Sequence, residues 1–565
     1  MNTRVIVDTE PGSSHEGVPG IIKLDAISRA SSVESWLDKH LDALALAVVA
    51  AGFAVRVLVA GRSYLNPDEA LHYMLINQSS AFLAYKASIA IAHPPLLFLL
   101  LYFWHFLGHS ELMLRLPSVF AGAALCWMVF KWIGIVLGRT ASLIGLIIVT
   151  FSPALIALSA EVREYALLLF CTATAMYFLE RAFQEKSVSQ MCYFSIFLYL
   201  AILTHYSALF FTVAIGLYSL TRISDSHFPR KVVVAWASGQ AGALAIYGFL
   251  YVTQVSKLKG AIAAWGSGFG QSYFQAGSMD IFTFTWRNTS NIFLFMFEQP
   301  YLSQAILLFI VVGVLILFVR DLVSRRGNPQ PSHLGILLVL PFIAIWGAAI
   351  AGKYPYVGSR HTVVLAPFAI AGVSFLLATV CRQKLSAGLV IAALLMAASN
   401  ASGDSMERGI TREDQSRTQM IAAVNQIHQS IPRSDLILVD MQSSFPIVYY
   451  LCDPREINPT NTVHGPFNQF SCDGYSIVSF PVWKLAAVNF LSQFEKMART
   501  YGLKSGDQVW VFQSGWGVNL DTDLPSHLQQ FRCLTPKSFG ANLSVIPFVV
   551  GPDFLPAEPL TSCGK

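Results

Sequence analysis

Long apolar runs separated by short polar segments occupy most of the first 400 residues. Runs of about 18 or more apolar residues are long enough to cross the hydrocarbon core of a bilayer as a helix. The pattern therefore predicts a bundle of membrane-spanning helices. The candidate segments lie at 42–60, 94–108, 115–137, 140–158, 164–181, 191–204, 206–221, 232–253, 301–319, 333–351, 362–381 and 385–400.

The segment 94–108 is the weakest of these candidates. It begins near two prolines and carries His105, and a helix of about 15 residues reaches only about 23 Å across a core of about 30 Å. If it lies along the outer surface, the short loops rich in Lys and Arg all fall on one side, which marks that side as cytoplasmic. These residues are Lys131, Arg139, Arg181, Lys186, Arg222, Arg230, Lys231, Arg320, Arg325, Arg326, Arg382 and Lys384. We therefore predict eleven spans, with the N-terminus inside and the C-terminus outside.

The composition agrees with a polytopic membrane protein. The chain is 54% hydrophobic and only 13% charged, whereas soluble domains carry about a quarter charged residues. We expect no cleavable signal peptide, because residues 1–38 are polar and many further apolar runs follow the first one. The sequence contains no P-loop, dinucleotide fingerprint, C-x-x-C or H-E-x-x-H motif, and we expect no nucleic-acid partner.

Beyond residue 400 the pattern changes to short strand-like runs, such as "DLILVD" and "QVWVFQ", and one segment with helical spacing, "TQMIAAVNQIHQSI". This pattern predicts a small soluble α/β domain. We therefore expect a cytoplasmic segment over 1–38, a helical membrane domain over 39–400 and an extracytoplasmic α/β domain over 401–565.

The predicted outer domain contains four cysteines: Cys452, Cys472, Cys533 and Cys563. An even number of cysteines outside the membrane favours disulfides, with three pairings open. The alternative is four free thiols.

Four polar clusters interrupt the apolar pattern on the predicted outer face. They are "YLNPDEALHY" at 64–73, "SAEVREY" at 159–165, "THYS" at 204–207 and "KYPYVGSRH" at 353–361. Charged groups close to the membrane interior are costly and usually functional. We therefore predict a shared site on this face.

Asp68 and Glu69 are the first candidates for catalysis. Asp68 is placed to remove a proton from an attacking hydroxyl as a general base. Glu69 would raise the basicity of Asp68 by repulsion or hold it by hydrogen bonding. The alternative is that Pro-Asp-Glu begins a surface helix, whose positive end favours carboxylates.

The other clusters offer cations and ligands. Arg163 suits a phosphate, although it would equally snorkel to lipid headgroups. Glu161 and Tyr165 are four residues apart and would share one helix face. Arg56 lies inside the first span and needs an anionic partner or a wet cavity. The remaining candidates, His93, His205, Arg360 and His361, would each be a ligand, a donor or a structural group.

Three motifs resemble a known class of enzymes. In order and spacing, "NPDEALHY", "AHPPLLFLLLYFWHFLGHSELMLRLPS" and "SAEVREYALLL" are similar to the membrane glycosyltransferases of the GT-C class. Within this class, the similarity is to the bacterial branch of the protein O-mannosyltransferase and aminoarabinose lipid A transferase superfamily. It extends over about 42–225, and over 226–400 by pattern alone.

The resemblance implies a GT-C fold of about eleven spans with juxtamembrane helices, and a sugar donor carried on a polyprenyl phosphate. It places the catalytic base at Asp68. His93 lies where some relatives have a metal-binding glutamate, and His205 lies near a basic residue that contacts the donor phosphate. Tyr165 stands near the second aspartate of the aminoarabinose transferases, so Glu161 would take the part of that acid. These departures leave open whether a divalent metal ion is needed.

The predicted function is sugar transfer to a hydroxyl of an envelope glycan, lipid or protein, with inversion, on the outer face of a bacterial inner membrane. The catalytic candidates are Asp68, Glu69 and Glu161. The donor-binding candidates are Arg163, Arg56, Tyr165, His205, Arg360 and His361, and the metal candidate is His93. The alternatives are a flippase for lipid-linked sugars, which would need no base, and a non-catalytic membrane protein that binds envelope sugars.

The span arrangement is open to a direct test. A topology reporter fused after residue 400 is expected to be active only outside the cytoplasm, and one inserted at 382–384 only inside. Cytoplasmic activity of the first fusion would contradict the arrangement and the shared outer face.

Overall fold

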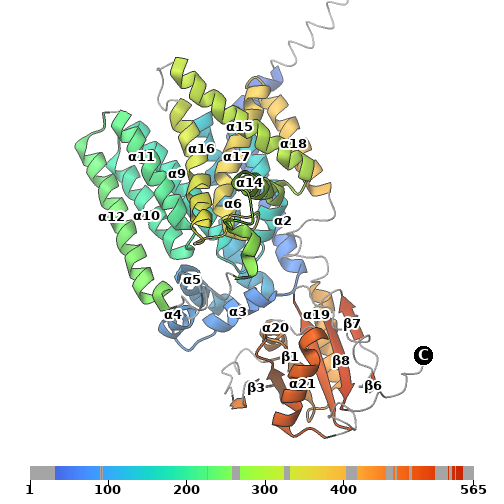
Figure 1. Ribbon diagram of the computed structural model, residues 1–565. Coiled ribbons are helices and arrows are strands. Elements are labelled where there is room, and N and C mark those ends of the chain that lie inside the picture. Colours follow the sequence, from blue (N-terminus) through green and yellow to red (C-terminus); the bar gives the residue numbers. More distant parts are fainter. Residues whose placement is uncertain are drawn as a thin grey trace, which may run out of the picture.

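A bundle of long helices stands on a small domain built around a β-sheet (Figure 1). The computed structural model describes residues 32–89, 91, 93–225, 227–257, 267–323, 331–401, 416–452, 462–464, 467–482, 487–504, 506–515, 532–533, 537–540 and 543–550. This architecture confirms the predicted fold class, a helical membrane domain followed by an α/β domain.

Most helices of the bundle coincide with the predicted apolar segments. They are α2 (Leu41–Arg62), α6 (Glu111–Leu137), α7 (Arg139–Phe151), α8 (Pro153–Ser159), α9 (Tyr165–Glu185), α10 (Val188–Thr204), α11 (Ala208–Asp225), α12 (Arg230–Thr253), α15 (Pro300–Val323), α16 (Pro331–Ile350), α17 (Ala366–Val380) and α18 (Leu385–Ala401). Among the described residues, seven helices are long and apolar enough to cross a membrane, or eight if α7 and α8 form one bent span. The total of eleven spans therefore stays a prediction.

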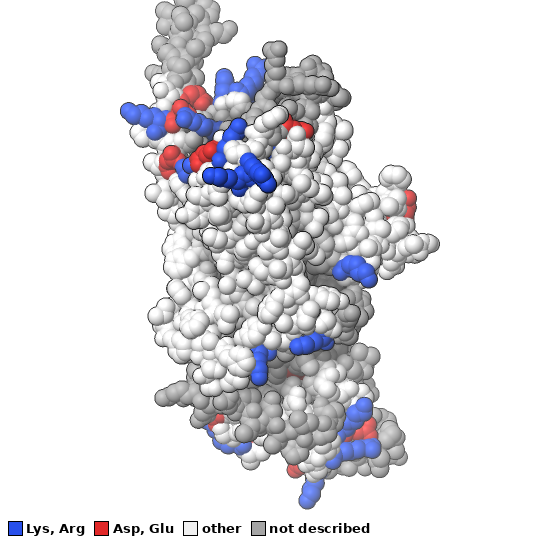
Figure 2. Space-filling model, turned by 90° about the vertical axis from the view of Figure 1, so that its left-hand side faces the viewer, with Lys and Arg blue, Asp and Glu red and all other residues white. Residues whose placement is uncertain are grey.

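The surface of the bundle has the charge distribution of a membrane protein. Figure 2 shows a broad belt with few charged side chains, and a cluster of Lys, Arg, Asp and Glu at the end of the bundle away from the sheet domain. Such a belt suits contact with lipid tails, where an unpaired charge is costly. The protein is therefore a multi-pass membrane protein.

Short helices lie across the other end of the bundle, next to the sheet domain (Figure 1). They include α3 (Pro67–Ile76), α4 (Ala81–Ile89), α5 (Leu96–Trp104) and η1 (His105–Leu107). The predicted segment 94–108 is thus a short surface helix, and its Phe103 and Phe106 are about two-thirds exposed, at 64% and 66%. Exposed aromatic side chains on such a helix suit the membrane interface. One helix that the sequence pattern did not reveal, α14 (Ile281–Phe297), lies between α12 and α15 in the chain.

Arg56 has a different environment from the one expected. It is fully buried in α2, and its guanidinium donates hydrogen bonds to the carbonyls of Val149, Thr150 and Gly52, each at 3.1 Å. The chain bends by 59° between α7 and α8, where Pro153 has no N–H to offer the Val149 carbonyl. Arg56 therefore satisfies carbonyls at this break, and these contacts favour a structural role over donor binding.

The sheet domain has helices on both faces of one mixed sheet. The strand order is β2-β3-β4-β1-β5-β8-β6, with β7 paired to β8. β1 is parallel to β4 and β5, and the other pairs are antiparallel. The strands are β1 (Leu436–Val439), β2 (Thr462–His464), β3 (Phe467–Cys472), β4 (Tyr475–Ser479), β5 (Gln508–Ser514), β6 (Arg532–Cys533), β7 (Lys537–Gly540) and β8 (Leu543–Val549). Helices α19 (Arg417–Ser430) and α20 (Met441–Leu451) share a core with one face, and α21 (Ala487–Tyr501) shares a core with the other.

The structure settles the pairing of two of the four cysteines in the predicted outer domain. Cys452 and Cys472 form a disulfide, which ties the end of α20 to the end of β3. The side chain of Cys533 and the whole of Cys563 lie outside the described residues.

The sheet domain and α3 share one hydrophobic core. Tyr64, Leu65 and Tyr73 are fully buried in the cluster that also contains Ile447 and Val448 of α20. The contact is also polar. The hydroxyl of Tyr450 accepts a hydrogen bond from the Leu65 N–H at 2.8 Å and donates one to Glu111 of α6 at 3.1 Å. The sheet domain therefore holds the chain segment that leads into α3.

The contacts of Arg56 predict that its loss affects stability and not ligand binding. Arg56→Met leaves buried carbonyls unpaired, each at a cost of about 1–3 kcal/mol. We expect a lower Tm in detergent and unchanged affinity of the folded protein for a polyprenyl phosphate. Arg62→Met, at the exposed end of the same helix, is the control. A selective loss of polyprenyl phosphate binding in Arg56→Met would support the donor-binding interpretation instead.

Candidate active site

The candidate site lies at the end of the bundle that faces the sheet domain, around the first turn of α3 (Figure 1). Asn66 is the N-cap of this helix and Pro67 is its first residue. The Asn66 side chain accepts a hydrogen bond from the Glu69 N–H, and the Glu69 carboxylate accepts one from the Asn66 N–H, each at 3.0 Å. The helix-start interpretation is therefore correct for "NPDE", and it accounts for Glu69.

Glu69 also forms a buried, bidentate ion pair with Arg115 of α6. The Arg115 Nε lies 2.7 Å from Oε1 of Glu69, and its Nη2 lies 2.6 Å from Oε2. Glu69 Oε1 accepts a further hydrogen bond from the Val162 N–H at 2.8 Å. Both side chains of the pair are 1% exposed. Glu69 thus joins α3 to α6 and to the segment before α9, and these contacts indicate a structural role.

Asp68 points to a different set of partners. Its Oδ2 lies 2.9 Å from Nη1 of Arg163 and 2.9 Å from Nη2 of Arg360. Burial raises the pKa of Asp68, but the two guanidinium groups more than offset this effect and hold the pKa below its ordinary value. Two cations from separate loops therefore converge on one carboxylate oxygen.

Glu164 lies beside Asp68 and its two arginines, and three histidines surround its carboxylate. Its carboxylate oxygens lie 3.1 Å from Nδ1 of His93, 3.6 Å from Nε2 of His72 and 3.9 Å from Nε2 of His205. Arg163 Nη2 is 3.6 Å from the same carboxylate. Glu164 is 1% exposed, and neither of its oxygens has a hydrogen-bond partner of good geometry in the described structure.

The protonation states in this cluster suit a metal ion. Burial lowers the pKa of His93 to about 3 and that of His205 to about 4, although Glu164 raises both. Burial raises the pKa of Glu164, but Arg163 and His93 outweigh it and hold that pKa well below its usual range. Neutral imidazoles beside an ionised carboxylate are the forms that bind divalent metals. One ligand atom from each of these three residues lies within 4.8 Å of the others.

Glu161 and Tyr165 do not share a helix face as predicted, because α9 begins only at Tyr165. Burial and the neighbouring Glu69 raise the pKa of Glu161 well above its ordinary value, which favours its protonated form. It accepts a hydrogen bond from the Asn66 side chain at 3.3 Å. The Tyr165 hydroxyl accepts one from Arg163 at 3.2 Å. His361 contacts Ser359 and Tyr354 through its backbone.

The sequence interpretation missed Glu164, His72 and Arg115. Glu164 is adjacent to Arg163 in "AEVREY", but the expected helical spacing favoured Glu161, four residues before Tyr165. His72 lies one turn beyond Asp68. Arg115 is a charge inside an apolar segment, which is a recognised sign of function or of a buried ion pair.

Comparison with known proteins agrees with the resemblance. Residues 92–252 match the family described as dolichyl-phosphate-mannose-protein mannosyltransferase. ArnT from Cupriavidus metallidurans bound to undecaprenyl phosphate is similar at 12% identity and a TM-score of 0.51, over 88% of this chain and 97% of that one. Its apo state is similar at 11% identity and a TM-score of 0.51, over 92% and 100%. An oligosaccharyltransferase from Archaeoglobus fulgidus tethered with an acceptor peptide has 12% identity and a TM-score of 0.48, over 90% and 74%. No curated protein sequence matches the chain.

The family match and the shared fold confirm the predicted resemblance to the GT-C superfamily. The matched segment contains His93, Arg163, Glu164 and His205, whereas Asp68 and Arg360 lie outside it. The structural similarity to ArnT shows the fold, but at 12% identity it assigns no role to any residue. In general terms, these findings support a membrane glycosyltransferase.

The contrast between the two buried glutamates generates a stability prediction. Glu69→Gln removes a charge that is paired with Arg115, and breaking a buried pair from one side costs about 3–5 kcal/mol. Among the described residues, Glu161 has no cation in direct contact, so Glu161→Gln keeps the shape of the side chain without breaking an ion pair and is expected to cost about 1 kcal/mol or less. Thermal unfolding in detergent compares the two variants, and equal losses would contradict the different roles of the two carboxyl groups.

Proposed function

We propose that this protein transfers a sugar from a polyprenyl phosphate to an acceptor hydroxyl, with Asp68 as the general base. The observation that carries the proposal is the shared contact of Arg163 and Arg360 with one oxygen of Asp68, at 2.9 Å each. Two guanidinium groups that converge on one anionic oxygen also suit a phosphate. Asp68 itself is 14% exposed, so it remains accessible from the site.

Asp68 pairs with the two arginines that the donor phosphate would bind. When the phosphate binds, Arg163 and Arg360 turn their hydrogen bonds to it, and Asp68 loses the partners that lower its pKa. Burial then raises that pKa, so the carboxylate becomes a stronger base only when the donor is present. This coupling prevents a buried, unpaired carboxylate in the empty site.

The reaction follows from these positions. Asp68 accepts the proton of the acceptor hydroxyl, and the hydroxyl oxygen forms a bond to the anomeric carbon of the sugar. The bond from that carbon to the phosphate oxygen breaks, and its electron pair stays with the phosphate, where Arg163 and Arg360 stabilise the growing charge. Attack opposite to the leaving group inverts the configuration. The products are the glycosylated acceptor and the polyprenyl phosphate.

A divalent metal ion fits the chain's own ligands. His93, Glu164 and His205 would hold it, as the unpartnered buried atoms Nδ1 of His93 and Oε1 and Oε2 of Glu164 indicate. The charges also favour it: Arg115, Arg163 and Arg360 are balanced by Glu69, Asp68 and Glu164, so an arriving phosphate adds uncompensated negative charge. When bound, such an ion would supply Lewis-acid stabilisation of the phosphate.

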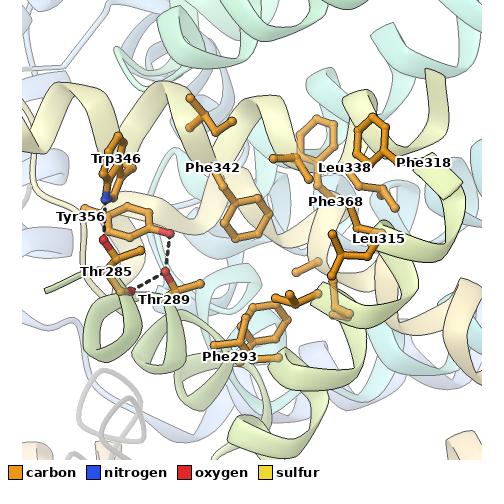
Figure 3. A pocket seen from close by; sticks show the side chains of 17 residues that line it. Thr285, Thr289, Phe293, Leu315, Phe318, Leu338, Phe342, Trp346, Tyr356 and Phe368 are labelled. Carbon is orange, nitrogen blue, oxygen red and sulfur yellow. Dashed lines mark hydrogen bonds between the residues drawn. The ribbon is translucent and has the colours of Figure 1, made fainter. Parts of the chain in front are cut away.

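An apolar cavity of about 480 Å³ suits the lipid part of the donor. It lies between α14, α15, α16 and α17 (Figure 3), and Leu315 and Ile343 in its wall are more than half exposed on the bundle surface. Thr285, Thr289, Trp346 and Tyr356 lie together at one end in Figure 3. There, Trp346 donates to Thr285 at 2.9 Å, and Thr289 bonds to Tyr356 at 2.8 Å.

Tyr356, at this polar end, belongs to the loop that carries Arg360 and precedes it by four residues. An isoprenyl chain in the cavity would thus begin close to the arginine that holds its phosphate. We place the site and the sheet domain outside a bacterial inner membrane, facing an envelope glycan, lipid or protein acceptor.

The central variant is Asp68→Asn, which keeps the shape of the side chain but cannot accept the proton. We expect turnover to fall by about 10²–10⁴-fold, while undecaprenyl phosphate binds at least as tightly, because Asp68 no longer competes for the arginines. Arg163→Ala should weaken binding as well as turnover. Near-normal turnover of Asp68→Asn on the true donor and acceptor would refute the assignment of Asp68 as the general base.

A further inference from the structure

Gln254 is a buried amide that joins three parts of the candidate site. It follows the last residue of α12 and is 2% exposed. Its Nε2 donates hydrogen bonds to the carbonyls of Ser88 at 3.1 Å, Ile91 at 2.8 Å and His93 at 2.7 Å. Its Oε1 accepts a hydrogen bond from the hydroxyl of Tyr206 at 2.6 Å.

These contacts meet a need created by the local sequence. Helix α4 ends at Ile89 and α5 begins at Leu96, so the carbonyls of Ile91 and His93 lie outside both helices. Pro94 and Pro95 follow directly and have no N–H to donate. Buried carbonyls without donors are costly. The Gln254 amide donates to both of these carbonyls and also to that of Ser88, which accepts a second hydrogen bond from the Ile91 N–H at 3.3 Å.

The surroundings also fix the orientation of the amide. Three acceptors lie on the side of Nε2 and one hydroxyl donor lies on the side of Oε1. A flipped amide would place its oxygen against three carbonyl oxygens. The side chain is therefore held in one direction, and the loop before α5 is held with it.

The same contacts link the two histidines beside Glu164. Gln254 binds the backbone of His93 directly, and it binds Tyr206, the neighbour of His205 in the turn between α10 and α11. The His93 and His205 rings are 5.8 Å apart between centroids. His93 Nδ1 in turn lies 3.1 Å from Glu164. A single side chain thus spans the two loops that present these imidazoles.

We propose that Gln254 is a positioning residue that keeps His93 and His205 facing Glu164. It touches neither the carboxylate nor the expected position of the phosphate, and it acts through the backbone of His93 and through Tyr206. The inference deepens the proposed metal site and rests on it, but the hydrogen bonds to the loop are testable without any ligand.

The matched variants are Gln254→Met and Gln240→Met in the full-length protein in detergent. Methionine keeps the length of glutamine and removes both donors and the acceptor, so packing is largely preserved. Gln240 lies on the same helix α12 and is partly buried, and the same change there serves as the control. Tyr206→Phe removes only the hydroxyl that holds Oε1.

The first measurement is Co²⁺ affinity, followed by visible absorption. Loss of a group that orients a metal ligand typically weakens binding by about 10–100-fold. We expect that loss for Gln254→Met, a change within about twofold for Gln240→Met, and a smaller loss, about threefold, for Tyr206→Phe. Unchanged Co²⁺ affinity and absorption in Gln254→Met would overturn the positioning role.

The second measurement is hydrogen exchange over residues 84–95, which needs no metal. In Gln254→Met, the backbone amides of this segment should exchange about tenfold faster than in the wild type and in Gln240→Met, because the buried hydrogen bonds of the Gln254 side chain are lost. If the wild type binds no more Co²⁺ than a His93→Ala variant does, the metal site is wrong, and exchange alone then judges the loop contact. Equal exchange in Gln254→Met and the wild type would refute the proposal in either case.

Discussion

The buried ion pair between Glu69 and Arg115 is the interaction on which the candidate site depends. Arg115 also donates to the carbonyls of Ala60, Ser63 and Tyr64, so it fixes the chain where the first span passes into α3. Glu69 completes the cap of that helix and ties it to the segment before α9. Because Arg115 pairs with Glu69, the adjacent Asp68 is not needed for this pair and contacts Arg163 and Arg360 instead. Two neighbouring carboxylates therefore have separate roles, one in the structure and one, as we propose, in the chemistry.

Opposite charges are also paired in the rest of the site. Each ionised group found there has an opposite charge within about 4 Å, as a low-dielectric environment requires, and burial lowers the pKa of His93 and of His205. Such a site suits an anionic ligand, because Arg163 and Arg360 can turn from Asp68 to a phosphate, which leaves the carboxylate without these partners and makes it a stronger base. The sheet domain contributes from outside the bundle, since Tyr450 and the shared hydrophobic core hold the segment that enters α3.

Much of the fold could be predicted from the sequence, since long apolar runs and the short segment at 94–108 carry the architecture in their lengths. The convergence of the clusters around Asp68, Arg163, His205 and Arg360 followed from their placement on one face. Glu164 could not be distinguished from Glu161, because the residues between them are not helical and spacing rules do not apply there. The contacts of Tyr450 with Leu65 and of Gln254 with His93 join parts of the chain 385 and 161 residues apart, and no local pattern indicates them.

The most direct test of the central claim is to incubate the purified protein in detergent with a pool of lipid-linked sugars and a membrane extract, and to follow the lipids by mass spectrometry. The account predicts that one polyprenyl-phosphate sugar disappears while free polyprenyl phosphate and a glycosylated acceptor accumulate in equal amounts. A pool that stays unchanged for every polyprenyl-phosphate sugar, with folded protein present, would contradict it.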